Sequence, residues 1–164
     1  MSSTLNRAAH HLVQPEPHWK NLLECAAMEV FSMMVGAGLE PFPGSVENFH
    51  AEQTAMVGLA GAVCGMVTIR CSTPTAEQLA TLMLGADAAN NPSMMGDALG
   101  ELCNMVAGNF KSKVTTMADH CMLSVPTVIS GGDYVLQTVL PHEGFEVVLG
   151  LEGEPLWFCI VIHT

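Results

Sequence analysis

The spacing of apolar and polar residues predicts three helices. The first extends from Trp19 to Val35, where apolar residues recur at steps of three and four, as on the buried side of an amphipathic helix. The second extends from Ala76 to Leu84, after Thr73-Pro74 has supplied an N-cap and a proline at the first helical position. The third, from Ser93 to about Val114, follows the start signal Asn90-Asn91-Pro92 and contains no further proline. It is the longest predicted element, at about six turns.

The remaining apolar runs predict an antiparallel sheet. Residues 54–71 are interpreted as two strands that turn near Gly58 to Gly65, whereas residues 39–49, with two prolines, are interpreted as a loop. Further strands, each bounded by turn residues, are predicted at Met122–Ile129, Tyr134–Leu140, Phe145–Leu151 and Leu156–Ile162. The turns between the last four fall at residues 130–133, 141–144 and 152–155. The fold class is therefore α+β, with long helices packed on an antiparallel sheet and a helix-plus-strands unit used twice.

Composition fits one domain and excludes several classes of protein. The chain has 164 residues, of which 49% are hydrophobic, enough for a sizeable core over residues 19–164. Five basic against 16 acidic residues give a net charge of −11, which disfavours a nucleic acid partner. The longest uncharged run is interrupted by glycine and too short to span a membrane.

Cysteine and histidine suggest neither disulfides nor a metal site. The six cysteines lie in apolar stretches without a C-x-x-C pair, and the N-terminus carries no export signal, so we expect buried thiols and a cytoplasmic protein. His10, His11 and His18 fall in a predicted flexible leader, residues 1–18, where Gln14-Pro15-Glu16-Pro17 sets no ligand geometry. The other histidines are scattered. We therefore predict no metal site at these residues.

The long helix carries the candidate chemistry. Its apolar side falls on one line of the helical wheel and is predicted to face the core: Met95, Leu99, Leu102, Cys103, Val106, Phe110 and Val114. The opposite side holds a polar strip, whose members follow one another at steps of four, three, four and three residues: Asp97, Glu101, Asn104, Gly108 and Lys111. Neighbours in this strip lie side by side on the helix surface.

Such a strip is usually a solvated helix face, but two features favour a function. Gly100 and Gly108 flank Glu101 and Asn104 in mid-helix, where each glycine costs about 1 kcal/mol relative to alanine, which the close approach of another surface would explain. A carboxamide does not titrate near neutral pH, but it can orient a water molecule, which is sufficient help for hydrolysis of an acyl phosphate. Mg²⁺ or Ca²⁺ held by Asp97, Glu101 and Asn104 is the less favoured alternative, because one helix face rarely supplies enough oxygen ligands.

These residues resemble a known signature. The helix from Asp97 to Lys111 is similar to the D/S-x3-E-x2-N helix of the CheX, CheC and FliY phosphatases, and Ser124–Gly131 resembles the proline-containing strand that follows it in those proteins. Residues 29–36, 56–69 and 76–85 are also similar to the CheX-type pattern.

The resemblance implies hydrolysis of the aspartyl phosphate of a CheY-like response regulator. Asn104 would position the attacking water, Glu101 would pair with a lysine of the regulator, and Asp97 would support the helix face. Gly108 and Lys111 complete the expected contact surface. The Mg²⁺ would belong to the regulator, so no cofactor of this chain is implied.

The resemblance also bears on assembly. The first helix carries Glu24 but has Ala27 where an asparagine would complete a second site, so a CheX-like homodimer with one site per chain is implied. Two rivals stay open: a docking module that binds a receiver domain or another signalling protein without hydrolysis, and a domain that binds a small molecule or metal.

Overall fold

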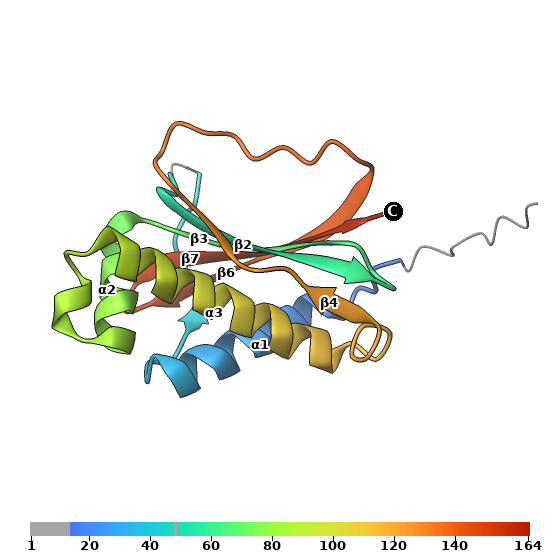
Figure 1. Cartoon of the computed structure of the whole chain (residues 1–164), viewed down its shortest axis with the longest axis horizontal. Coiled ribbons are helices and arrows are strands. Elements are labelled where there is room, and N and C mark those ends of the chain that lie inside the picture. Colours follow the sequence, from blue (N-terminus) through green and yellow to red (C-terminus); the bar gives the residue numbers. More distant parts are fainter. Residues whose placement is uncertain (1–13, 48) are drawn as a thin grey trace, which may run out of the picture.

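Seven strands form one antiparallel sheet, and three helices cover one of its faces (Figure 1). The computed structural model describes residues 14–47 and 49–164. The strands are β1 Glu40–Pro41, β2 Gln53–Gly61, β3 Gly65–Cys71, β4 Cys121–Leu123, β5 Thr127–Ser130, β6 His142–Leu151 and β7 Glu154–His163. Their order is β1-β6-β7-β3-β2-β4, and β5 also pairs with β2. The predicted α+β class is confirmed.

The three predicted helices are present, with small differences at their ends. They are α1 Trp19–Met34, α2 Thr73–Leu84 and α3 Pro92–Lys113. The N-cap of α2 is Ser72, whose Oγ accepts a hydrogen bond from the Thr75 amide at 3.3 Å, so the prediction of Thr73 was one residue late. Asn91 caps α3 through its Oδ1, which accepts from the amides of Ser93 and Met94. A short 3-10 helix, Ala86–Ala88, connects α2 to α3.

The core lies between the helices and the sheet. Trp19 of α1 meets Phe110 of α3 edge-to-face at a centroid distance of 6.1 Å, and Phe31 meets Phe158 of β7 in the same way at 5.7 Å. These four rings are fully buried, so α1 is held against both its neighbouring helix and the sheet. No helix in the described part of the chain is long and apolar enough to cross a membrane.

The two hairpins follow the predicted pattern. β2 and β3 pair from Gln53↔Cys71 to Leu59↔Gly65, and β6 and β7 pair along their whole length through a turn at Glu152 and Gly153. The region predicted as a loop, residues 39–49, holds the two-residue strand β1, which pairs with the end of β6. Of the predicted leader, residues 1–13 lie outside the described residues, and residues 14–18 lead into α1.

The segment before β6 corrects three predictions. The strand expected over Met122–Ile129 is two strands, β4 and β5, separated by Pro126, which has no amide hydrogen to donate to a sheet ladder. The strand expected over Tyr134–Leu140 is absent from the described structure, and β6 already begins inside the turn expected at 141–144.

The topology explains why the expected strand does not form. β5 lies beside β2, whereas β6 lies beyond β3 and β7, so residues 131–141 must cross the sheet to connect them. In Figure 1 this segment passes over the face that carries no helix. A chain that crosses above the strands has no neighbour with which to form a ladder.

Candidate functional site

Helix α3 presents the predicted strip away from the core. The seven residues expected to face inward are all buried. On the opposite side Asp97 and Glu101 are exposed, and Asn104, Gly108 and Lys111 are half-buried. The helix is continuous from Pro92 to Lys113, so Glu101 and Asn104 stand one turn apart on its outer surface.

The polar groups of this strip are not used to hold the fold together. Within residues 14–47 and 49–164, the side chains of Asp97, Glu101, Asn104 and Lys111 form no hydrogen bond or ion pair with another residue. On the neighbouring edge of the same helix, by contrast, Asn109 and Lys113 both bind a residue of α1.

That neighbouring edge ties α3 to α1. Asn109 donates from Nδ2 to Glu29 at 3.2 Å, and Lys113 Nζ lies 2.8 Å from the same carboxylate. The hydrogen bond from Lys113 and, to a smaller extent, that from Asn109 lower the pKa of Glu29. Helix α3 therefore carries two asparagines with different roles: Asn109 stabilises the contact with α1, whereas the Asn104 carboxamide has no partner in the part of the chain that the structure describes.

The structure gives a different reason for Gly100 than the one expected. A Cβ added at Gly100 would lie 3.4 Å from Pro126 and from Val128, so the surface that approaches the helix here belongs to the same chain. At Gly108 the nearest atom to an added Cβ would be in Leu123, at 3.8 Å. Gly100 therefore lets the segment around Pro126 lie close against α3, whereas the 3.8 Å at Gly108 is an ordinary van der Waals contact that an alanine could also make.

A groove runs beside the strip. It has a volume of about 740 Å³ and lies between the N-terminal half of α3, the end of α2 and the segment around Pro126. Asp97, Glu101, Leu84 and Val125 are among the residues that line it. Val125 is 84% exposed and Leu84 48% exposed, unusual values for such apolar side chains. Asn104 lies outside the residues that line this groove.

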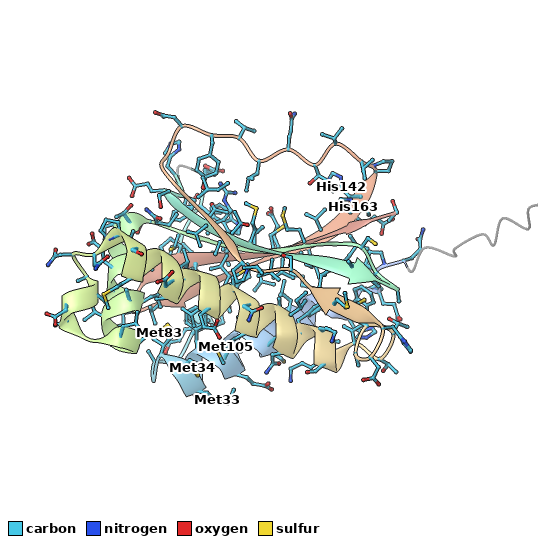
Figure 2. All side chains as sticks on the ribbon, in the orientation of Figure 1. Met33, Met34, Met83, Met105, His142 and His163 are labelled. Atoms are coloured by element: carbon cyan, nitrogen blue, oxygen red, sulfur yellow. The ribbon has the colours of Figure 1, made fainter. Side chains whose placement is uncertain are left out.

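The apolar wall was not predicted as part of the site. Leu84 is the last residue of the second predicted helix, and Val125 directly precedes Pro126 in the proline-containing strand, so both belong to segments with a clear sequence pattern. Only the fold places them next to the acidic residues of α3. Figure 2 shows Met83 of α2, Met105 of α3 and Met34 of α1 on the helical side of the sheet.

The site contains no cysteine nucleophile. Cys103 is on the buried side of α3, where its thiol donates to the Val67 carbonyl at 3.6 Å and burial raises its pKa to about 12. The described residues hold no group of three His, Cys, Asp or Glu side chains arranged to bind a metal ion. Ala27 of α1 is fully buried, so α1 presents no second strip at that position. The strip therefore presents a carboxylate and a carboxamide on a helix face that another molecule can approach.

Comparison with known proteins identifies the relatives of this chain. Residues 53–149 match the family model of the chemotaxis phosphatase CheX. The CheY-P phosphatase CheX of Thermotoga maritima is 31% identical over 121 residues, which cover 70% of this chain and 74% of that protein.

Two solved structures share the fold. The chemotaxis protein CheX of Vibrio vulnificus superposes with a TM-score of 0.75 at 18% identity, over 92% of this chain and all of that one. The CheX–CheY–BeF3–Mg²⁺ complex of Borrelia burgdorferi contains a chain that superposes with a TM-score of 0.72 at 21% identity, over 89% of this chain and 98% of that one. At these identities the agreement concerns the arrangement of helices and strands.

Proposed function

This chain belongs to the family of the chemotaxis phosphatase CheX, and from that premise we propose that it hydrolyses the aspartyl phosphate of a CheY-like response regulator. The Thermotoga relative is named for this activity, and the Borrelia structure holds CheX together with CheY. In this proposal Asn104 orients the attacking water, and Glu101 pairs with a lysine of the regulator. The observation that carries the assignment is that both side chains lie on the outer face of α3 without a partner among the described residues.

The reaction depends more on the position of the attacking water than on a general acid or base. The water oxygen attacks phosphorus, the bond between phosphorus and the aspartyl oxygen breaks, and the products are a free carboxylate and inorganic phosphate. Because an aspartyl carboxylate is a good leaving group, a water held in line with it is a sufficient contribution. The Asn104 carboxamide has both an acceptor oxygen and a donor nitrogen for that water.

The metal is assigned to the regulator. The Borrelia structure contains Mg²⁺ and BeF3 together with CheY, which supports a metal bound with the receiver domain. On this chain the strip offers two carboxylates, Asp97 and Glu101, from one helix face, too few for a Mg²⁺ site made by protein alone. Bound Mg²⁺ would offset charge on the phosphoryl group.

The receiver is proposed to dock on the strip and the groove together. Asp97 and Glu101 would meet basic groups of the receiver, and the apolar wall around Leu84 and Val125 would cover an aliphatic side chain next to them. Gly108 would let the receiver approach the helix backbone, and Lys111 would contact it at the far end of the strip.

The test is hydrolysis of the phosphorylated receiver by two matched variants. Asn104→Ala should fold normally and lose about 100-fold or more in the rate of phosphate release, the loss typical of removing one positioning group. Asn109→Ala removes the same carboxamide from the same helix, but from the contact with Glu29, and should keep the activity. Equal rates for Asn104→Ala and the natural protein would refute the assignment.

The alternative is a docking module without catalysis. It shares the strip and the partner but predicts binding of the BeF3-activated receiver with no acceleration of phosphate loss. Measurement of binding and phosphate release on one preparation separates the two, because Asn104→Ala should keep binding in the phosphatase proposal while release is lost.

We also propose that residues 19–164 act as one domain, in the cytoplasm, as a homodimer. The outer edge of β6 supports the assembly, because β1 pairs only with Gly150 and Leu149 and leaves His142–Val148 without a neighbouring strand on that side, among the described residues. An unpaired sheet edge is a surface on which a second copy can add a strand.

A further inference from the structure

The sheet has a second cavity on the face that carries no helix. It holds about 340 Å³ and lies between strands β3, β6 and β7 and the crossing segment, which contributes Leu136, Gln137 and Thr138. That volume is at the lower end of the range for small-ligand sites. Figure 2 shows His142 where the crossing segment joins β6, at one end of this face.

The strand register places three chemically distinct groups in this cavity. Arg70 of β3 is opposite Trp157 of β7, and Cys159 of β7 is opposite Glu146 of β6. Trp157 and Cys159 are two residues apart, so their side chains share a face with those of their cross-strand partners. All four residues line the cavity. One wall is therefore cationic, the opposite one anionic, and an indole lies beside the cation.

The charge of Arg70 is not compensated within the described chain. Its Nε is buried and has no hydrogen-bond partner there, and no carboxylate in residues 14–47 and 49–164 forms an ion pair with its guanidinium. The guanidinium lies 5.9 Å from the centroid of the Trp157 ring. Arg70 as a whole is half-buried, and an arginine in such a position without an acidic partner is unexpected in a chain with 16 acidic and five basic residues. A bound anion would supply the missing acceptor.

Glu146 restricts what that anion can be. It lines the same cavity without forming an ion pair with Arg70, so a simple anion would meet repulsion from its carboxylate. A molecule that carries one negative and one positive group could pair with both Arg70 and Glu146. Cys159, between them, adds no negative charge at neutral pH, because burial raises its pKa to about 11.

We infer that this cavity binds a small zwitterion of the α-amino acid class with an apolar side chain. Its carboxylate would accept hydrogen bonds from Arg70, its ammonium group would face Glu146, and its side chain would lie against Trp157 and Leu136. A guanidinium suits a carboxylate because its N–H groups form a planar fork.

The crossing segment forms a roof for such a ligand. Near its start, the Tyr134 hydroxyl is hydrogen-bonded to the Thr54 hydroxyl of β2. At its end, the Pro141 carbonyl accepts a hydrogen bond from the Thr164 amide, which follows β7, at 3.1 Å. The segment is thus held at both ends, above a cavity that lies on the opposite side of the sheet from α3 (Figure 1). Ligand binding here is independent of the proposed phosphatase site.

The experiment is calorimetric titration of the full chain with L-phenylalanine, L-leucine and L-methionine. At least one should bind saturably, with one site per chain and a Kd at or below about 1 mM. Two analogues of L-phenylalanine test the charges: 3-phenylpropionate lacks the ammonium group and 2-phenylethylamine lacks the carboxylate. If L-phenylalanine is the ligand, each should bind at least about tenfold more weakly, since each leaves one charged wall unpaired.

Variants locate the site. Arg70→Gln should abolish binding, and the exposed Glu146→Gln, which leaves the core untouched, should weaken it at least about tenfold. Lys113→Gln makes the same charge change as Arg70→Gln far from the cavity and should bind as the natural protein does. Failure of all three amino acids to bind, or binding that survives both cavity substitutions, would overturn the inference. If Arg70→Gln does not fold, Glu146→Gln decides alone.

Discussion

At the scale of single residues, function in this protein depends on which polar side chains the fold leaves unpaired. Asn104 and Asn109 are the same residue type, five positions apart on one helix. Asn109 donates to Glu29 and so links α3 to α1, whereas Asn104 has no partner among the described residues. A free carboxamide beside a free carboxylate can bind a water and a cation of another molecule, which a side chain already engaged in the fold cannot do.

Glu101→Gln is expected to weaken the complex with the receiver. The substitution keeps the shape of the side chain and removes the charge that is proposed to pair with a lysine, so KM should rise about tenfold while kcat changes little. Steady-state hydrolysis of the phosphorylated receiver at low salt measures both. Glu24→Gln in α1 is the control with the same charge change. A loss confined to kcat would mean that Glu101 acts in the chemical step instead.

At the scale of elements, the site is made by three segments that meet along α3. Gly100 lets the Pro126 segment lie against the helix, and Leu84 at the end of α2 also lines the groove. The groove therefore depends on a close helix–segment contact as much as on the side chains within it.

Substitution of Gly100 and of Gly96 in α3 should distinguish the effect of close packing from the effect of helix propensity. Gly100→Leu should lower the free energy of unfolding by about 1–3 kcal/mol, because the larger side chain must displace Pro126 and Val128. Gly96→Ala should raise it by about 0.5–1 kcal/mol, since an added Cβ there contacts nothing and alanine favours the helix. Urea denaturation measures both. Similar effects at the two positions would contradict the close contact at Gly100.

Two exposed leucines of α2 allow a controlled test of whether the groove takes part in receiver binding. Leu84→Glu should weaken receiver binding at least about tenfold by placing a charge on the apolar wall, whereas Leu82→Glu should leave binding unchanged. Both leucines are exposed, 48% and 45%, so neither change should unfold the protein. Titration of the BeF3-activated receiver gives the affinities, and equal affinities for the two variants would exclude the groove from the interface.

At the scale of the whole molecule, the sheet separates two surfaces with different chemistry. The helical side carries the strip and the groove, and the other side carries the Arg70 cavity beneath the crossing segment. The helical layer itself is held by apolar packing and by the contact of Glu29 with Asn109 and Lys113.

The Glu29 contact should give the stability of the molecule a specific pH dependence. Hydrogen bonds from Lys113 and then Asn109 lower the pKa of Glu29 below its usual value of 4.5. Its contribution is therefore present above pH 4.5 and is lost as the pH falls through the lowered value in the folded state. Glu29→Gln should melt at a slightly lower temperature than the natural protein at pH 7, and the difference should disappear near pH 3. A constant difference over this range would contradict the linkage.

The proposed homodimer predicts a molecular mass of twice 17.4 kDa in solution. Light scattering during size-exclusion chromatography at micromolar concentration measures it. A mass of one chain under those conditions would refute the assembly and leave the proposed active site unaffected, because the strip lies within a single chain.

The local pattern of the sequence determined the helices and the strip. The three- and four-residue period between Trp19 and Val35, and the caps before α2 and α3, act within one or two turns, so these elements follow from neighbouring residues. The same periodicity placed Glu101 and Asn104 on one outward face. The close contact of Gly100, by contrast, is with Pro126, 26 residues further along the chain, and no local pattern reveals it.

The features that join segments distant in the sequence were decided only by the tertiary structure. Residues 134–140 have strand-like composition but no ladder, because the order of the strands makes them cross the sheet. The groove joins Leu84 to Val125, and the second cavity joins Arg70 to Glu146. The direction of a side chain within a helix or strand is set by the neighbouring backbone. Its partners, however, depend on which strands and helices the fold brings together. No local pattern in a single sequence encodes those pairings.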